Sequence, residues 1–214
     1  AVMAQVLLDD GRPVLSPAAV REMTRSRVPV PDPYLIGPEW ALGLVVCDWG
    51  GQTVYATDGS TVGQHARLRI LPESNVAVAM LANGLPRDSF YRKVFSEILA
   101  DLGLVTVPDL PQPDPALRLD PAGYEGVYER PGARFEVAVA AGRPRLTVFS
   151  DPMQAQVLGK PQRSTYELLP VSETRFLMPS EDPLEDTRTV AIYDFADGRA
   201  RYLHTNARVH PRID

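Results

Sequence analysis

A proline-rich stretch in the middle of the chain is the feature that most constrains its fold. Five prolines fall between Pro108 and Pro121, and almost no apolar periodicity accompanies them. Prolines at this density favour extended, semi-rigid connections and interrupt helices and central strands. We therefore predict a linker over residues 105–121. It separates a first domain at residues 1–104 from a second domain at residues 122–214.

Residues 1–104 carry an α+β pattern. Ser16 followed by Pro17 is typical of a helix start, and residues 88–102 repeat apolar side chains at helical spacing. Between them, short alternating segments indicate strands, and Val76–Ala82 is apolar on both faces, which predicts a central strand. We expect an antiparallel sheet with packed helices. Ala1–Leu8 predicts the last turns of a helix that begins outside this chain.

Residues 122–214 contain about seven short candidate strands and no pattern that predicts a helix. Turn residues separate the strands, among them Pro131-Gly132 and the hairpin signal Asp197-Gly198. This spacing is typical of a small all-β antiparallel barrel or sandwich. The chain as a whole is therefore predicted to be of the α+β class.

Composition excludes several kinds of partner. The net charge is −5 and is spread over both halves, so we expect no nucleic acid. No apolar run reaches the roughly 18–20 residues of a membrane helix, so we expect no membrane span. The single cysteine, Cys47, rules out an internal disulfide framework and is expected to be a small buried hydrophobe. Nothing in the sequence tells a cytoplasmic protein from an exported one.

The order of short motifs in residues 1–104 is similar to that of a known enzyme family. The motifs are Leu15-Ser16-Pro17, Leu42-Gly43-Leu44, the segment Thr57–Gly63, Leu71-Pro72-Glu73 and Asn83-Gly84. Together they resemble the C-terminal part of the serine β-lactamase-like hydrolases: class C β-lactamases, D-alanyl-D-alanine carboxypeptidases and related esterases. Residues 124–132 are similar to the lipocalin-like β-domains that some of these hydrolases carry.

The resemblance implies acyl transfer on an amide, ester or β-lactam carbonyl of a small-molecule substrate, with no cofactor. A serine nucleophile needs a nearby base and backbone donors for the developing oxyanion. The family's third motif falls on Thr57-Asp58-Gly59. The resemblance implies that Ser60 donates its backbone N–H to the oxyanion hole and that Thr57 and Asp58 form the pocket wall. Gly59 would then allow the substrate to approach closely.

The chain departs from the family at its other motifs. Neither of its two lysines, Lys93 and Lys160, has a serine three residues before it, so the SxxK motif is absent. The YxN motif is absent as well, and Thr57 stands where the family has a cation or an imidazole. We do not expect this chain alone to be active. Two explanations stay open: an upstream segment or second chain completes the site, or the protein is a non-catalytic descendant that binds a ligand or partner.

Two further groups of residues have the types that chemistry requires. Ser60, His65 and Asp58 are those of a hydrolytic triad, although closeness in sequence rarely gives the geometry. A metal chelate from His204, His210 and Asp214 would have a spacing that fits no structural site, and we predict no metal.

Overall fold

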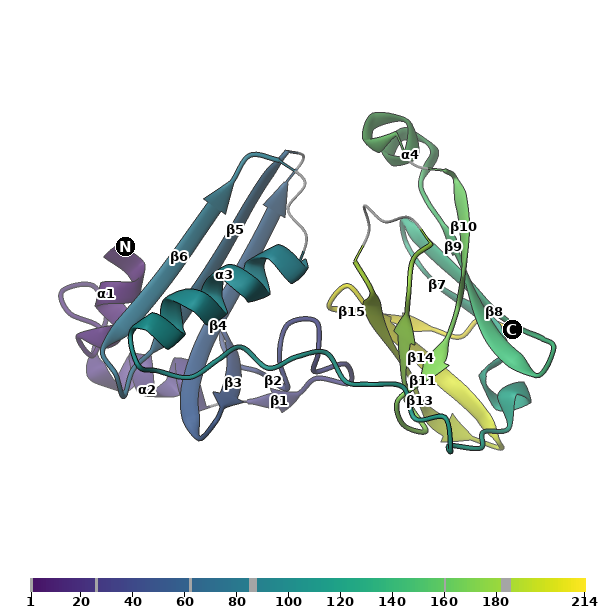
Figure 1. Cartoon of the computed structure of the whole chain (residues 1–214), viewed down its shortest axis with the longest axis horizontal. Coiled ribbons are helices and arrows are strands. Elements are labelled where there is room, and N and C mark those ends of the chain that lie inside the picture. Colours follow the sequence, from purple (N-terminus) through teal and green to yellow (C-terminus); the bar gives the residue numbers. More distant parts are fainter. Residues whose placement is uncertain (1, 26, 62, 85–87, 160, 182–185) are drawn as a thin grey trace. The chain divides into compact units, whose positions relative to one another are not determined.

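The computed structural model describes residues 2–25, 27–61, 63–84, 88–159, 161–181 and 186–214. The chain divides into two compact units, Ala1–Leu110 and Pro111–Asp214. Figure 1 shows that antiparallel sheets make up most of each unit. The two units are considered separately below.

The first unit is built on one six-stranded sheet whose strands follow in chain order. They are β1 (Val28–Pro29), β2 (Glu39–Trp40), β3 (Val45–Trp49), β4 (Gln52–Thr61), β5 (Gln64–Leu71) and β6 (Val76–Ala82). The turn from β3 to β4 needs two glycines, because Gly50 and Gly51 both have positive φ. The Asp48 carboxylate closes this turn by accepting the Gly51 N–H at 2.7 Å.

Three helices accompany this sheet: α1 (Val2–Leu8), α2 (Pro17–Arg25) and α3 (Asp88–Asp101). The helix start at Ser16 is confirmed, because the Ser16 hydroxyl accepts the Ala19 N–H at 3.1 Å. The predicted helix over residues 88–102 is confirmed as well, and Gly103 follows it with a positive φ.

Two small cores lie on opposite faces of the sheet. One, on the face that α3 crosses in Figure 1, contains Val45, Cys47, Trp49, Val54, Ala56, Leu71 and Leu99. The other, against α1 and α2, contains Ala4, Leu7, Val20, Leu44 and Ile70. The prediction that Val76–Ala82 is a central strand is wrong, because β6 is the last strand of the described sheet and alternates between exposed and half-buried residues.

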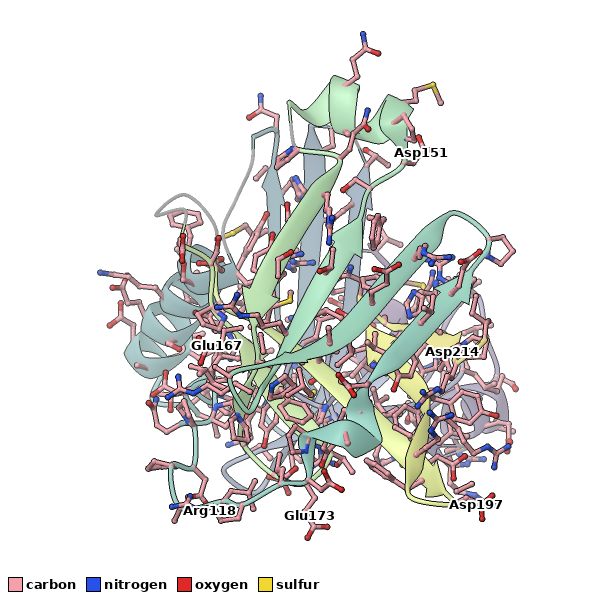
Figure 2. All side chains as sticks on the ribbon, turned by 90° about the vertical axis from the view of Figure 1, so that its right-hand side faces the viewer. Arg118, Asp151, Glu167, Glu173, Asp197 and Asp214 are labelled. Atoms are coloured by element: carbon pink, nitrogen blue, oxygen red, sulfur yellow. The ribbon has the colours of Figure 1, made fainter. Side chains whose placement is uncertain are left out.

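The second unit contains two antiparallel sheets. One has the order β10-β9-β8-β7 and the other β11-β12-β13-β14-β15. Their strands are β7 (Gly126–Arg130), β8 (Ala133–Ala140), β9 (Arg143–Phe149), β10 (Arg163–Glu167), β11 (Leu169–Pro170), β12 (Arg175–Met178), β13 (Arg188–Ala196), β14 (Arg199–Thr205) and β15 (Arg208–Pro211). A 3₁₀ turn, η1 (Pro121–Tyr124), precedes them. The turn predicted at Asp197-Gly198 is confirmed, since both residues have positive φ between β13 and β14; Figure 2 labels Asp197.

The two sheets of this unit share one core. Its fully buried members are Tyr128, Leu146, Phe176, Val190, Ile192, Ala200 and Leu203. The Tyr128 hydroxyl reaches the Tyr124 carbonyl at 2.8 Å, and the Tyr124 hydroxyl reaches the Glu173 carbonyl at 2.7 Å. Each buried phenol therefore has an acceptor, which a core of this kind requires.

The predicted α+β class is wrong. The described residues form a mainly β structure of three antiparallel sheets, in which the helices are few and short. The second unit consists of two open sheets and not of a closed barrel. A long apolar pattern such as that of residues 88–102 makes a helix easy to predict. Two-residue strands such as β1 and β11 have almost no periodic signal, so the strand content is underestimated from sequence.

One short helix was not predicted. Helix α4 (Pro152–Leu158) follows Asp151, whose carboxylate accepts the Met153 N–H at 3.0 Å. Seven residues are too few for a helical period to stand out, so only the cap and Pro152 signal this helix. Across the described residues, no helix has both the length and the apolar character needed to span a membrane.

Candidate functional site

The predicted site residues Thr57 to Ser60 lie together on β4, which is twice as long as the preceding strand. β3 pairs with β4 only from Gln52 to Ala56, whereas β5 pairs with it from Tyr55 to Thr61. In the described part of the chain, residues 57–61 of β4 therefore have a strand neighbour on one side only. Along such an edge, backbone N–H and C=O groups of alternate residues point away from the sheet.

The alternation of the strand sends these side chains to two faces. Thr57 and Gly59 share one face, and both are exposed. A Cβ built on Gly59 would have nothing within 4 Å. Ala66 of β5 pairs with Gly59 of β4 and with Leu81 of β6, and the Leu81 side chain is 81% exposed. This face is open and, at Leu81, apolar.

An open hollow of about 560 Å³ lies at the same end of the sheet. It is lined by Gly59, Ser60, Thr61, His65, Leu81 and Asn83, among others. Its size falls within the range of small-molecule sites, and a few polar groups accompany its apolar wall. Of the residues predicted from sequence, Gly59 and Ser60 therefore border a space that a ligand can enter, whereas Thr57 and Asp58 do not line it.

Asp58 points to the other face and is held there by two arginines. Its carboxylate accepts two hydrogen bonds from the Arg69 guanidinium, at 2.6 and 3.2 Å, and lies 3.4 Å from Arg67. Arg67 also binds the Asp88 carboxylate, at the start of α3, at 2.7 Å. The side chains of Asp58 and both arginines are less than a fifth exposed, so these ion pairs are only weakly screened by solvent.

The same arginines lie against aromatic rings. The Arg67 guanidinium is 4.9 Å from the centre of the Tyr91 ring, and that of Arg69 is 5.6 Å from Phe95. Tyr91 and Phe95 are buried residues of α3. Cation–π contacts of this kind add to the ion pairs and fix the guanidinium planes. The network ties β4 to β5 and α3, directly behind the open face of Thr57 and Gly59.

Sequence reasoning missed this network. Arg67 and Arg69 alternate with apolar residues on β5, a pattern that suggests a solvated face. In the structure both are largely covered. The distance in sequence between Asp58 and the two arginines does not indicate that they form ion pairs. They meet only because the register of β4 and β5 places Asp58 opposite Arg67.

A second cavity, of about 210 Å³, borders this network. The Tyr91 hydroxyl lies in its wall, is buried, and has no hydrogen-bond partner among the described residues. Cys47 also lines it, and burial raises the pKa of the Cys47 thiol to about 11. The thiol therefore stays protonated near neutral pH. The predicted burial of Cys47 is confirmed, since the residue is 7% exposed.

Of the three triad-type residues, the structure brings two together. The Ser60 hydroxyl lies 2.9 Å from Nδ1 of His65, across the register pair Ser60↔His65. Asp58 is turned to Arg67 and Arg69 instead. The arrangement is a serine–histidine pair without a carboxylate.

The two histidines of the second unit do not form a cluster with Asp214. His210 accepts the Arg130 Nε–H at 3.1 Å, whereas Asp214 accepts the Val127 N–H and binds Arg212. Burial lowers the pKa of both histidines, that of His204 to about 4. Both rings are therefore neutral near pH 7.

Comparison with known proteins adds a family context. No protein-family model matches the sequence. The chain is 35% identical over 125 residues to penicillin-binding protein 4 of Amycolatopsis lactamdurans. The matched residues make up 58% of this chain and 33% of that protein. The fold of this chain matches the crystal structure of SurE with a TM-score of 0.73 and 27% sequence identity. The match covers 98% of this chain and 46% of SurE.

A second structure, SurE with D-Leu, matches with a TM-score of 0.70 and 26% identity, over 98% of this chain and 48% of that one. The chain thus spans about a third of the curated relative and about half of SurE. It carries a region similar in sequence to a penicillin-binding protein, on a fold that it shares with SurE.

Proposed function

We propose that this chain is the C-terminal portion of a serine hydrolase or acyltransferase of the penicillin-binding type. It would act on the amide, ester or β-lactam carbonyl of a small-molecule acyl substrate. The similarity to penicillin-binding protein 4 supports the reaction class. The crystal structure of SurE with D-Leu supports substrates that contain a D-amino acid.

The observation that carries the proposal is the one-sided edge of β4 over residues 57–61. An extended acyl substrate can align along such an edge and receive backbone hydrogen bonds. In this proposal the Ser60 N–H donates to the oxyanion and Thr57 and Gly59 line the substrate, whereas the Asp58 side chain, on the other face, anchors the strand to Arg67 and Arg69. The arginines behind Asp58 would hold the edge in place, and preorganised donors of this kind stabilise developing charge best.

The nucleophile and its base would come from an upstream segment or a second chain. Two features of the first unit support a further segment that covers the β6 end of its sheet. β6 is apolar along its length and yet is the last strand of the described sheet. Leu81 is exposed beside the hollow. Apolar edge strands are prone to aggregation, and native proteins cover them.

A second function is favoured by Thr57. A threonine at this position supplies neither a positive charge nor a group that titrates near neutral pH. A protein that binds acyl compounds without catalysis would keep the open edge and could lose the cation. This alternative predicts ligand binding with no turnover even when the covering segment is present.

The test begins with the intact mass and copurifying partners of the native protein, together with the reading frame upstream of Ala1. If a segment with SxxK and YxN motifs is found, the complete protein is assayed with nitrocefin and with a D-leucyl p-nitroanilide. Turnover of either substrate that is lost when the SxxK serine becomes alanine supports the hydrolase. Binding without turnover supports the alternative, and absence of both contradicts both.

A matched control uses this chain alone. T57K restores the family's cation but not the nucleophile, so neither it nor the unaltered chain should hydrolyse nitrocefin. Nitrocefin turnover by T57K, above that of a heat-inactivated sample, contradicts the assignment of the nucleophile to another segment.

A further inference from the structure

The contact between Ser60 and His65 has the geometry of a nucleophile and its base. The Ser60 hydroxyl oxygen lies 2.9 Å from His65 Nδ1, within the hydrogen-bond distance that activated serines require. The two residues face each other across the β4–β5 ladder, so the strand register holds them together. Neither residue's side chain takes part in the site proposed above, which uses only the Ser60 backbone.

The surroundings allow a small molecule to reach the hydroxyl. Ser60 is exposed, and both residues line the hollow of about 560 Å³. His65 Nε2, in contrast, is buried and meets no hydrogen-bond partner in the described ranges. The open hydroxyl therefore lies on the accessible side of the pair, and the imidazole lies behind it.

We propose that Ser60 and His65 form an acyl-accepting pair that reacts with small activated esters. Ser60 Oγ bonds to the carbonyl carbon while its proton passes to His65 Nδ1. The bond from the carbonyl carbon to the leaving oxygen breaks, and the proton leaves with that oxygen as the free alcohol or phenol. Water then hydrolyses the acyl-Ser60 ester and restores the serine.

The pair lacks the carboxylate of a full triad, and this sets the substrate class. Among the described residues no carboxylate orients His65, because Asp58 is bound to Arg67 and Arg69. General bases contribute about 10²- to 10⁴-fold in complete sites, so a pair without an orienting group belongs at or below the lower end. Aryl esters, whose leaving groups need less help from a proton donor as the bond breaks, fit such a site better than amides.

The experiment measures acetylation of this chain by p-nitrophenyl acetate, with intact mass followed by peptide mapping. The unaltered chain should carry acetyl on Ser60, and S60A should lose that adduct. H65N retains a hydrogen-bonding group near the position of Nδ1 but cannot take up the proton. It should acetylate Ser60 at least about tenfold more slowly.

Ser74 provides the matched control. Its hydroxyl lies 3.0 Å from the Gln52 side-chain oxygen, so it has a hydrogen-bond partner but no base. S74A should leave the rate at Ser60 unchanged. Both residues of the pair lie at the end of a hairpin, and circular dichroism melts verify that the variants fold.

Two results would overturn the proposal: no acetyl on Ser60 of the unaltered chain, or equal rates for it and H65N. Peptide mapping separates both from acetylation of Lys93, Lys160 or the terminal amine. S60A keeps the backbone N–H, so a failure here concerns only the hydroxyl and leaves the proposed function to its own test.

Discussion

The two units bury their apolar side chains in different ways. In the second unit, two sheets face one core, and side chains from both, such as Leu146 and Phe176, have no exposed surface. In the first unit, one sheet carries a small core on each face, and the end of β6 is left with an exposed Leu81. The core of the second unit is covered by its own two sheets, whereas the first unit leaves an apolar side chain exposed at its last described strand.

This difference separates residues that hold the fold from residues that are available for chemistry. The open edge of β4, the hollow beside it and the Ser60–His65 pair all belong to the first unit. In the second unit, by contrast, the Tyr124 and Tyr128 hydroxyls are hydrogen-bonded within the core. Sites are found where a scaffold leaves groups accessible, and buried satisfied groups mainly specify packing.

The largest expected effect is on the core of the second unit. Phe176 is fully buried and Phe195 is 42% exposed, yet both rings meet Tyr124 edge-on, at 5.3 and 5.2 Å. F176A should lower the free energy of unfolding by about 3–5 kcal/mol, because it leaves a cavity. F195A should cost about 1 kcal/mol, mainly the aromatic contact. Urea unfolding, monitored by hydrogen exchange of the β12 amides, measures both free energies. Equal losses of stability in F176A and F195A would contradict a core that is packed at Phe176 and open at Phe195.

Acid should destabilise the second unit next. Burial, then His210 and Arg208, lower the pKa of His204 from 6.5 to about 4. The unfolded chain therefore binds more protons between these values, and the unit's stability is full above pH 6.5 and declines towards pH 4. The loss should reach about 3 kcal/mol by pH 4. H204L, which cannot titrate, should flatten this decline; an unchanged slope in H204L would assign the acid sensitivity to other groups.

A medium effect is expected in the ion-pair network of the first unit. D58N removes the charge that Arg67 and Arg69 share and should cost about 1–3 kcal/mol, because the guanidiniums are largely covered. E97Q breaks an exposed pair with Lys93 and should cost less than about 0.5 kcal/mol. Both tryptophans lie in this unit, so their fluorescence follows its unfolding. A D58N cost as small as that of E97Q would contradict a covered network.

The smallest effect is expected at the exposed edge. L81Q should change the unfolding free energy of the first unit by less than about 0.5 kcal/mol, since the Leu81 side chain is 81% exposed. I70A, on the neighbouring strand, should cost about 2–5 kcal/mol because Ile70 is buried. Tryptophan fluorescence during urea titration measures both. A large cost for L81Q would mean that Leu81 is covered in solution by this chain or by a second copy.

Local features were predictable where a residue type has a strong preference for one structural position, such as a helix N-terminus or a β-turn. Ser16 before Pro17 marked the start of α2, and Asp197-Gly198 marked the β13–β14 turn. The apolar spacing of residues 88–102 matched α3. These signals act within a few residues, so no tertiary contact is needed to interpret them.

The sequence by itself determined the start of α2, the extent of α3 and the tight turns, because propensity and side-chain periodicity act locally. It did not determine that β4 continues through Thr57–Ser60. Only the tertiary structure decided that β6 ends the described sheet, that Asp58 turns to two arginines, and that Ser60 meets His65. Each of these depends on strand order and register. A register shift of one residue would send every side chain of the strand to the other face, so the pattern of one strand cannot specify its partners.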